Sequence, residues 1–335
     1  MVPEQPLVER FTSELDALVS PDAAIGIAVS GGPDSLALLL LAAAARPGRV
    51  EAATVDHALR PESRGEAEMV ARLCESLAVP HRILTVTWER QPATALQEQA
   101  RAMRYRLLAQ WAGERRLDAL VTAHHLDDQA ETLMMRLARG AGVKGLAGMR
   151  AAARVPGASI PLIRPLLGWR HSELEALCAA AGVIPARDPS NHDSQFERVR
   201  VRKVLQKSDW LDTAAIASSA ANLADADAAL DWAAEWHWQQ AVTENGGTLV
   251  YRPGNAPAEI RRRVVRRAIL ALACEGDGEL RGRELDRLLR AVHGGGRATL
   301  RGVLCTGGVE WRFARAPARR AKAEPQSADR GSVEG

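Results

Sequence analysis

The sequence predicts an α/β protein with a doubly wound, mainly parallel sheet, followed by a smaller, mainly helical domain. Between residues 23 and 187, short β-rich runs alternate with longer helical segments, which is typical of βαβ units. After the stretch "ARDPSN" (186–191) the pattern changes to helices. We therefore expect a catalytic domain over residues 1–190, a helical domain over 191–315 and a disordered tail over 316–335.

The individual elements follow from local patterns. The expected strands are apolar or β-branched runs at 23–30, 50–56, 81–88, 119–124 and 159–166. The longest helices between them are expected at 62–78 and 94–116, and the second domain begins its helices at 230–240, 259–273 and 279–292. Since parallel strands end on one edge of a sheet, the residues that follow these strands are expected to meet there.

Composition limits the class of protein. The chain has 335 residues, 47% hydrophobic and 25% charged, which fits a folded protein with room for two domains. Residues 1–20 lack a signal-peptide pattern and the Leu/Ala run 36–45 is too short to span a bilayer, so we expect a cytoplasmic protein without membrane contact. The four cysteines are far apart, so neither a metal cluster nor a disulfide framework is expected.

The stretch "AVSGGPDSLALLLLAA" (28–43) has the order strand, glycine turn, helix start. This order directs unpaired backbone N–H groups and the positive end of a helix dipole at one point, where phosphate binds readily. The expected nucleotide-binding residues are Ser30, Gly31, Gly32, Pro33, Asp34 and Ser35. A purely structural turn favours the same residue types. No lysine follows the glycines, which argues against γ-phosphoryl transfer.

The spelling Ser-Gly-Gly-x-Asp-Ser resembles the PP-loop of the N-type ATP pyrophosphatases, which have an adenine nucleotide alpha hydrolase-like, Rossmann-like fold. Further segments resemble the tRNA(Ile)-lysidine synthetase family. They are "VDHALRPES" (55–63), "ARAMRY" (100–105), "TAHHLDDQAET" (122–132), "RGAGVKGLAGM" (139–149), "RPLL" (164–167) and "DPSN" (188–191) with the following "ERVRVRKVL". The ordered match covers residues 23–207, and "HHLDDQAET" is its most distinctive part.

The resemblance implies a ligase that joins free L-lysine to carbon 2 of the wobble cytidine in the isoleucine tRNA with a CAU anticodon. ATP would adenylate the carbonyl oxygen first, with release of pyrophosphate and later AMP, and Mg²⁺ would assist. The best-known members have a further C-terminal domain for the acceptor stem, and this chain is too short for a full one, so we expect a short form. A homodimer is left open.

The chemistry of these steps suggests particular residues. Asp34 is the candidate Mg²⁺ ligand in the loop. Arg101 and Arg104, at i and i+3 of one helix, could clamp phosphate or substrate. Asp127 and Asp128 begin a helix, where carboxylates could hold the lysine ammonium groups or deprotonate the attacking amine. The alternative for one of these two aspartates is N-capping.

Other polar residues are candidate substrate contacts. They are His57 and His124 after the second and fourth expected strands, and Glu131 one helical turn after Asp127. Neighbouring His124 and His125 suggest zinc, but adjacent histidines at a strand end point to opposite sides and no third ligand has suitable spacing. Metal binding by the pair is therefore not expected.

Basic residues of the second half are candidate tRNA contacts, since all of the net charge of +3 arises in residues 188–335. The basic residues close after "DPSN" are slightly favoured for the anticodon stem; they are Arg198, Arg200, Arg202 and Lys203. In "EIRRRVVRRAILALA" the arginines share one helical face, opposite apolar residues. That face holds Arg262, Arg263, Arg266 and Arg267, which could grip phosphates or could equally be a solvated face.

Rival functions make different demands on the sequence. A tRNA thiolase on the same fold would need cysteine pairs, which are missing, and a GMP or argininosuccinate synthetase would lack "HHLDDQAET" and "DPSN". An inactive RNA-binding protein on the same scaffold should lack Asp34, Arg104 or Asp128, and all three are present.

Overall fold

The computed structural model divides into two compact units, Met1–Asp227 and Ala228–Gly335. It describes residues 2–57, 62–88, 96–186, 195–273, 280 and 282–317. The division falls later than the boundary expected at residue 190, because helix α8 (Glu197–Lys207) packs on helix α5 (Leu126–Ala138) in the first unit. The motif "DPSN" and nearly all of the expected tail lie outside the described residues.

The first unit is built on a six-stranded sheet in the order β3-β2-β1-β4-β6-β5. Its strands are β1 (Ile25–Ala28), β2 (Val50–Asp56), β3 (His81–Thr85), β4 (Ala119–Val121), β5 (Ala152–Arg154) and β6 (Pro161–Ile163). All neighbours pair in parallel except β5 and β6, so the predicted mainly parallel sheet is confirmed. The strand order reverses between β1 and β4, and α/β proteins bind ligands at such a switch point.

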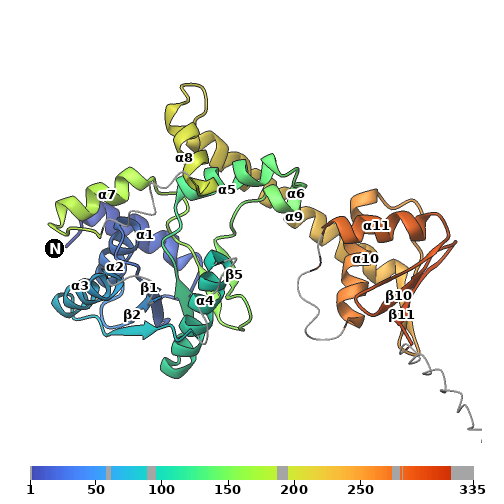
Figure 1. The fold of residues 1–335 in the computed structure, drawn as a ribbon, viewed down its shortest axis with the longest axis horizontal. Coiled ribbons are helices and arrows are strands. Elements are labelled where there is room, and N and C mark those ends of the chain that lie inside the picture. Colours follow the sequence, from blue (N-terminus) through green and yellow to red (C-terminus); the bar gives the residue numbers. More distant parts are fainter. Residues whose placement is uncertain are drawn as a thin grey trace, which may run out of the picture. The chain divides into compact units, whose positions relative to one another are not determined.

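Helices cover both faces of this sheet. They are α1 (Gln5–Asp16), α2 (Pro33–Ala45), α3 (Glu62–Ser76), α4 (Leu96–Arg115), α5, the short α6 (Val143–Leu146), α7 (His171–Ala180) and α8. Figure 1 shows α1 and α2 beside one another next to the sheet, and α7 also packs on α2. The side chains of β4 alternate between the two faces of the sheet. Ala119 and Val121 lie in the core under α2, and Leu120 lies in the core under α4.

The second unit combines helices with an antiparallel sheet. It contains the end of α9 (Thr213–Ala241), α10 (Ala258–Leu272) and α11 (Gly282–His293), which agree with the predicted helices. A five-stranded sheet in the order β7-β8-β11-β10-β9 was not predicted. Its strands are β7 (Val242–Asn245), β8 (Thr248–Tyr251), β9 (Arg297–Leu300), β10 (Val303–Thr306) and β11 (Trp311–Arg315). Buried Val264 and Ile269 of α10 pack in one core with Tyr251 and Phe313 of the sheet.

The helices and the cysteines bear on two further features of the chain, membrane spans and disulfides. Of the helices that the structure describes, none has the length and apolar character that crossing a bilayer requires. Cys74, Cys178 and Cys305 are buried and free, while Cys274 lies outside the described residues.

Candidate active site

The glycine turn between β1 and α2 forms one wall of the site. Gly31 has φ +87°, a conformation that favours glycine, and Gly32 is the N-cap of α2. The Ser35 hydroxyl donates to the Gly32 carbonyl (3.0 Å) and accepts from the Ser30 N–H (3.1 Å), which fixes the turn. Pro33 has no N–H, so the amides of Asp34 and Ser35 begin the helix without partners inside it. The turn therefore offers an anion site at a helix N-terminus.

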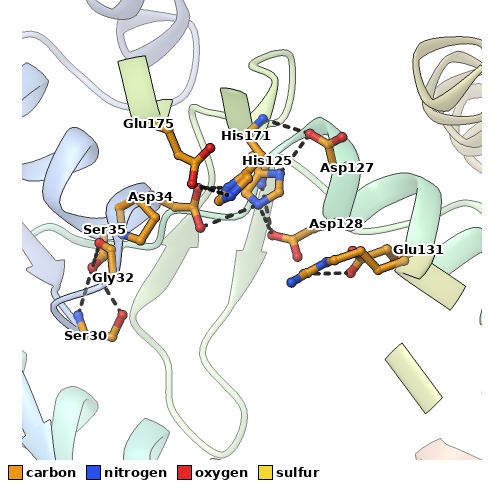
Figure 2. Close-up of polar contacts among 12 residues, drawn as sticks. Ser30, Gly32, Asp34, Ser35, His125, Asp127, Asp128, Glu131, His171 and Glu175 are labelled. Atoms are coloured by element: carbon orange, nitrogen blue, oxygen red, sulfur yellow. Dashed lines mark hydrogen bonds and ion pairs between the residues drawn. The ribbon is translucent and has the colours of Figure 1, made fainter. Parts of the chain in front are cut away.

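A cluster of histidines and carboxylates lies beside this turn (Figure 2). Asp34, in the first turn of α2, approaches the first residue of α7: its Oδ1 is 2.7 Å from His171 Nδ1. Its other oxygen is 3.7 Å from Nε2 of His125, which follows β4. Residues after β1, after β4 and after β6 thus meet at the carboxyl edge of the sheet, as parallel strands require.

Asp127 and Asp128 join the cluster through backbone amides. Asp128 Oδ2 accepts the N–H of His125 (3.2 Å). His125 is the N-cap residue of α5, so neither aspartate is itself the predicted N-cap, and Asp128 supports the cap from the third helical position. Asp127 Oδ2 accepts the N–H of His171 (2.8 Å) and so anchors the start of α7. The two aspartates also flank the buried His125 ring, at 3.4 Å from Nδ1 and 3.5 Å from Nε2.

The charges of this cluster stabilise one another. Burial alone would lower the pKa of His125, but Asp127, Asp128 and Asp34 outweigh it and raise the pKa. The hydrogen bond to Asp34 likewise raises the pKa of His171. Burial would raise the pKa of Asp127, yet the adjacent His125 imidazole and the hydrogen bond from the His171 N–H lower it to about 2. Asp127 is therefore a carboxylate at neutral pH.

A basic group lies around Tyr105 on α4. Arg101 donates to the Tyr105 hydroxyl (3.2 Å), and the Arg104 guanidinium carbon is 5.3 Å from the centre of the Tyr105 ring. Burial lowers the pKa of Arg104. Within the described ranges, neither Arg101 nor Arg104 forms an ion pair with a carboxylate. An exposed Arg101 beside a partly buried Arg104, neither paired with a described carboxylate, is suited to phosphate.

Two neutral histidines border the basic group. Burial, together with the charge of Arg104, lowers the pKa of His57, and burial lowers that of His124 to about 3 although Asp128 opposes the change. His124 Nδ1 is 2.9 Å from the Thr122 hydroxyl. The adjacent His124 and His125 thus belong to different groups, as expected for neighbours at a strand end.

Comparisons with known proteins agree with this geometry. Residues 6–208 match the family model of the PP-loop domain. The tRNA(Ile)-lysidine synthase of Novosphingobium aromaticivorans is 47% identical over 319 residues, 94% of this chain and 96% of the relative. The enzyme of the same name from Zymomonas mobilis subsp. mobilis is 42% identical over 88% of this chain and 89% of its own. This chain belongs to the tRNA(Ile)-lysidine synthase family.

Family membership makes the chain an enzyme and confirms the family predicted from its motifs. A solved structure supports the fold: the U34-tRNA thiolase NcsA from Methanococcus maripaludis with its [4Fe-4S] cluster superposes with a TM-score of 0.55. It is 18% identical, and the match covers 66% of this chain and 81% of that one. At that identity the likeness shows the shared α/β fold.

Glu131, expected as a substrate contact, is paired with two arginines in this member of the lysidine synthase family. Its side chain is buried on α5, and its oxygens lie 2.5 Å from Arg202 Nε and 3.3 Å from Arg198 Nε, both on α8. Arg198 also donates to the Thr132 hydroxyl (3.1 Å). Arginines occupy both oxygens of Glu131, so this carboxylate holds α8 on α5 rather than standing open to lysine. Arg200 donates to the Gln195 carbonyl (2.9 Å).

The arginine face of α10 is largely neutralised. Its apolar side is buried as predicted, but three of its four arginines pair with acids of α9, α10 or α11. The ion pairs are Arg262–Asp286, Arg263–Asp231, Arg263–Glu259 and Arg267–Glu235. Arg266 forms no ion pair with a described residue. Three of the expected phosphate contacts are thus paired with carboxylates, which favours a structural role over phosphate binding for them; Arg263 is only 9% exposed.

His171 is the site residue that sequence analysis missed. It lies 137 positions from Asp34 and belongs to none of the recognised motifs. The rule that strands end on one edge would have found it, because α7 follows β6, a parallel neighbour of β4. Sequence spacing offered no third ligand for the pair His124 and His125; in the structure Asp34 and His171, rather than His124, approach His125 from other segments.

Proposed function

We propose that this protein ligates free L-lysine to carbon 2 of the wobble cytidine of the isoleucine tRNA with a CAU anticodon, and converts ATP to AMP and pyrophosphate. The observation that carries the proposal is the meeting of a PP-loop and an acidic cluster at the switch point of the sheet in a family member. Arg101 and Arg104, which have no carboxylate partner among the described residues, act on the neighbouring His124. Each part corresponds to one chemical need of the reaction.

The PP-loop would bind the phosphates of ATP. The amides of Asp34 and Ser35, at the N-terminus of α2, provide donors for the β- and γ-phosphates, and Gly32 leaves open space for them. Asp34 fits Mg²⁺ as an oxygen ligand because its side chain is 27% exposed. When bound there, Mg²⁺ would neutralise phosphate charge. Because no loop lysine reaches the γ-phosphate, we propose cleavage between the α- and β-phosphates.

Arg101 and Arg104 would hold the α-phosphate during adenylation. The cytidine C2 oxygen attacks the α-phosphorus, the bond to the β-phosphate oxygen breaks, and pyrophosphate leaves. The product is an adenylated oxygen on carbon 2, and this oxygen later departs with AMP. Guanidinium groups without a carboxylate partner stabilise the charge that develops on such a phosphate. His57 and His124 stay neutral beside them and remain proposed substrate contacts.

Asp127 is the carboxylate that we assign to the lysine amine. Its side chain is 29% exposed, against 12% for Asp128, and it is ionised at neutral pH. A carboxylate there attracts and orients the ammonium group, and the low pKa of Asp127 suits this binding role better than proton transfer from the amine. Asp128 is more deeply buried and accepts the N–H of His125, the N-cap residue of α5, so it positions this segment. For tRNA, Arg200 and Arg266 remain proposed contacts, whereas Arg198 and Arg202 serve the pair with Glu131.

The nucleotide products test this proposal. The protein is incubated with ATP labelled at the α-phosphate, lysine and a transcript of the CAU isoleucine tRNA. We expect labelled AMP and free pyrophosphate in amounts that depend on the transcript. A control transcript with the anticodon UAU lacks the wobble cytidine and should give neither. Labelled ADP as the main product would overturn the mechanism.

A further inference from the structure

We propose that Asp34, His125 and His171 form a binding site for one divalent first-row transition ion of the Co²⁺ or Zn²⁺ type. Each residue offers one ligand atom, and these atoms all lie within 4.8 Å of one another. Two imidazoles and one carboxylate suit ions that accept nitrogen ligands, whereas Mg²⁺ prefers oxygen. The site is thus chemically different from the oxygen-ligated Mg²⁺ position expected at Asp34.

The spacing of the donors fits a single ion. His171 Nδ1 is 2.7 Å from Asp34 Oδ1, and His125 Nε2 is 3.7 Å from Asp34 Oδ2. Ligands about 2.0–2.2 Å from one zinc ion lie roughly 3 Å or slightly more from each other. The two imidazole rings are 5.3 Å apart with planes tilted by 31°. Small side-chain adjustments therefore bring all three donors to one ion.

The outer nitrogens of both imidazoles supply independent support. His171 Nε2 is 3.4 Å from Glu175 Oε1, one turn along α7, and His125 Nδ1 is 3.4 Å from Asp127 Oδ2. His125 Nδ1 is also buried without a hydrogen-bond partner. Metal-binding histidines characteristically direct their second nitrogen at a carboxylate, which fixes the tautomer and turns the lone pair of the first nitrogen toward the metal. Figure 2 shows this arrangement around His171 and His125.

The site can be reached from solvent. The side chains of Asp34 and His171 are 27% and 40% exposed, while His125 is 4% exposed and forms the floor. Three protein ligands leave coordination positions for water or a substrate oxygen. The inference shares Asp34 with the proposed function but needs neither nucleotide nor tRNA.

Cobalt binding to the full chain tests the site. Metal-free protein without an affinity tag is titrated with Co²⁺ in the absence of ATP and tRNA, and the visible d–d absorption is recorded. We expect one ion per chain and bands of a nitrogen-ligated site. His171→Gln should remove the bands. Glu175→Gln removes only the carboxylate behind His171 and should weaken binding by about 10- to 100-fold. Glu175 is 59% exposed, so this variant should fold normally.

His293→Gln is the matched control, because His293 is an exposed histidine of the second unit. It should leave the cobalt affinity unchanged. Absence of a spectral change at millimolar Co²⁺, or equal affinity in wild type, His171→Gln and Glu175→Gln, would overturn the proposal. Displacement of Co²⁺ by an equal concentration of Mg²⁺ would also overturn it, since that result indicates an oxygen site. Lysine ligation assayed with Mg²⁺ tests the proposed function, whereas the cobalt titration tests the metal site. A negative result in one assay therefore does not decide the other proposal.

Discussion

Replacement of Arg202 by methionine should destabilise the first unit more than removal of the charge on its partner, Glu131. Glu131 is 1% exposed and its carboxylate lies between Arg202 and Arg198. Burial holds the pKa of Glu131 above its usual value despite both arginines, so the pair does not fully offset the cost of burying the charge. The two halves of the pair should therefore respond unequally to mutation.

The magnitudes follow from exposure. Loss of one partner of a fully buried ion pair costs about 3–5 kcal/mol. Arg202 is 36% exposed and Arg198 stays 3.3 Å from Glu131, so solvent and the second arginine reduce the expected cost of Arg202→Met to about 1–3 kcal/mol. Glu131→Gln leaves no buried charge and lets Arg202 reach solvent, which should cost less than about 1 kcal/mol.

Urea unfolding followed by circular dichroism measures both variants and the double variant. Hydrogen exchange of α5 peptides assigns the loss to the first unit, because a two-unit chain need not unfold in one step. The double variant should recover most of the stability lost in Arg202→Met. Arg64→Met, in the exposed pair with Glu68, is the control and should change little. Equal costs for Arg202→Met and Glu131→Gln, or additive costs in the double variant, would refute the reasoning.

Three further predictions concern other parts of the chain. The pKa of Glu131 is raised in the folded state, so the stability that Glu131 contributes should fall as the pH rises above about 4.5. The urea midpoint of Glu131→Gln should therefore change less with pH than that of the wild type. An equal dependence of the two midpoints on pH would contradict this prediction. A Cβ at Gly307 would overlap the carbonyl oxygen of Val292. Gly307→Ala should therefore lower the free energy of unfolding of the second unit by about 1–3 kcal/mol, measured by urea unfolding. An unchanged free energy of unfolding would contradict this prediction. Arg266→Ala should weaken tRNA binding and reduce the slope of log affinity against log salt by about 0.7–0.9, whereas Arg267→Ala, whose charge is already paired with Glu235, should change the slope less; the reverse order would contradict the assignment.

The parts of the fold and site predicted from the sequence are those fixed by local rules. The turn at Gly31 follows from the need for positive φ between a strand and a helix, and the residues after β4 follow from the edge at which parallel strands end. That an aspartate takes part in the start of α5 also follows from local sequence, although His125 rather than Asp127 or Asp128 is the N-cap residue.

The features that were missed depend on contacts between distant segments. Helical periodicity predicted that the arginines of α10 share one face. It could not predict that Asp231, Glu235 and Asp286 of other helices form ion pairs with them. The antiparallel sheet of the second unit has strands of four or five residues, too short for a clear alternation to emerge. His171 was missed for the same reason, since only the folded chain brings it to Asp34.

Transfer of labelled lysine to RNA tests the proposed function most directly. The protein is incubated with radiolabelled L-lysine, ATP and Mg²⁺, with either the CAU isoleucine tRNA transcript or its UAU counterpart, and acid-insoluble label is counted. We predict ATP-dependent label in the CAU transcript, none in the UAU transcript, and none with Asp34→Ala although that variant remains folded by circular dichroism. No label in the CAU transcript, or equal label in both transcripts, would contradict the proposed function.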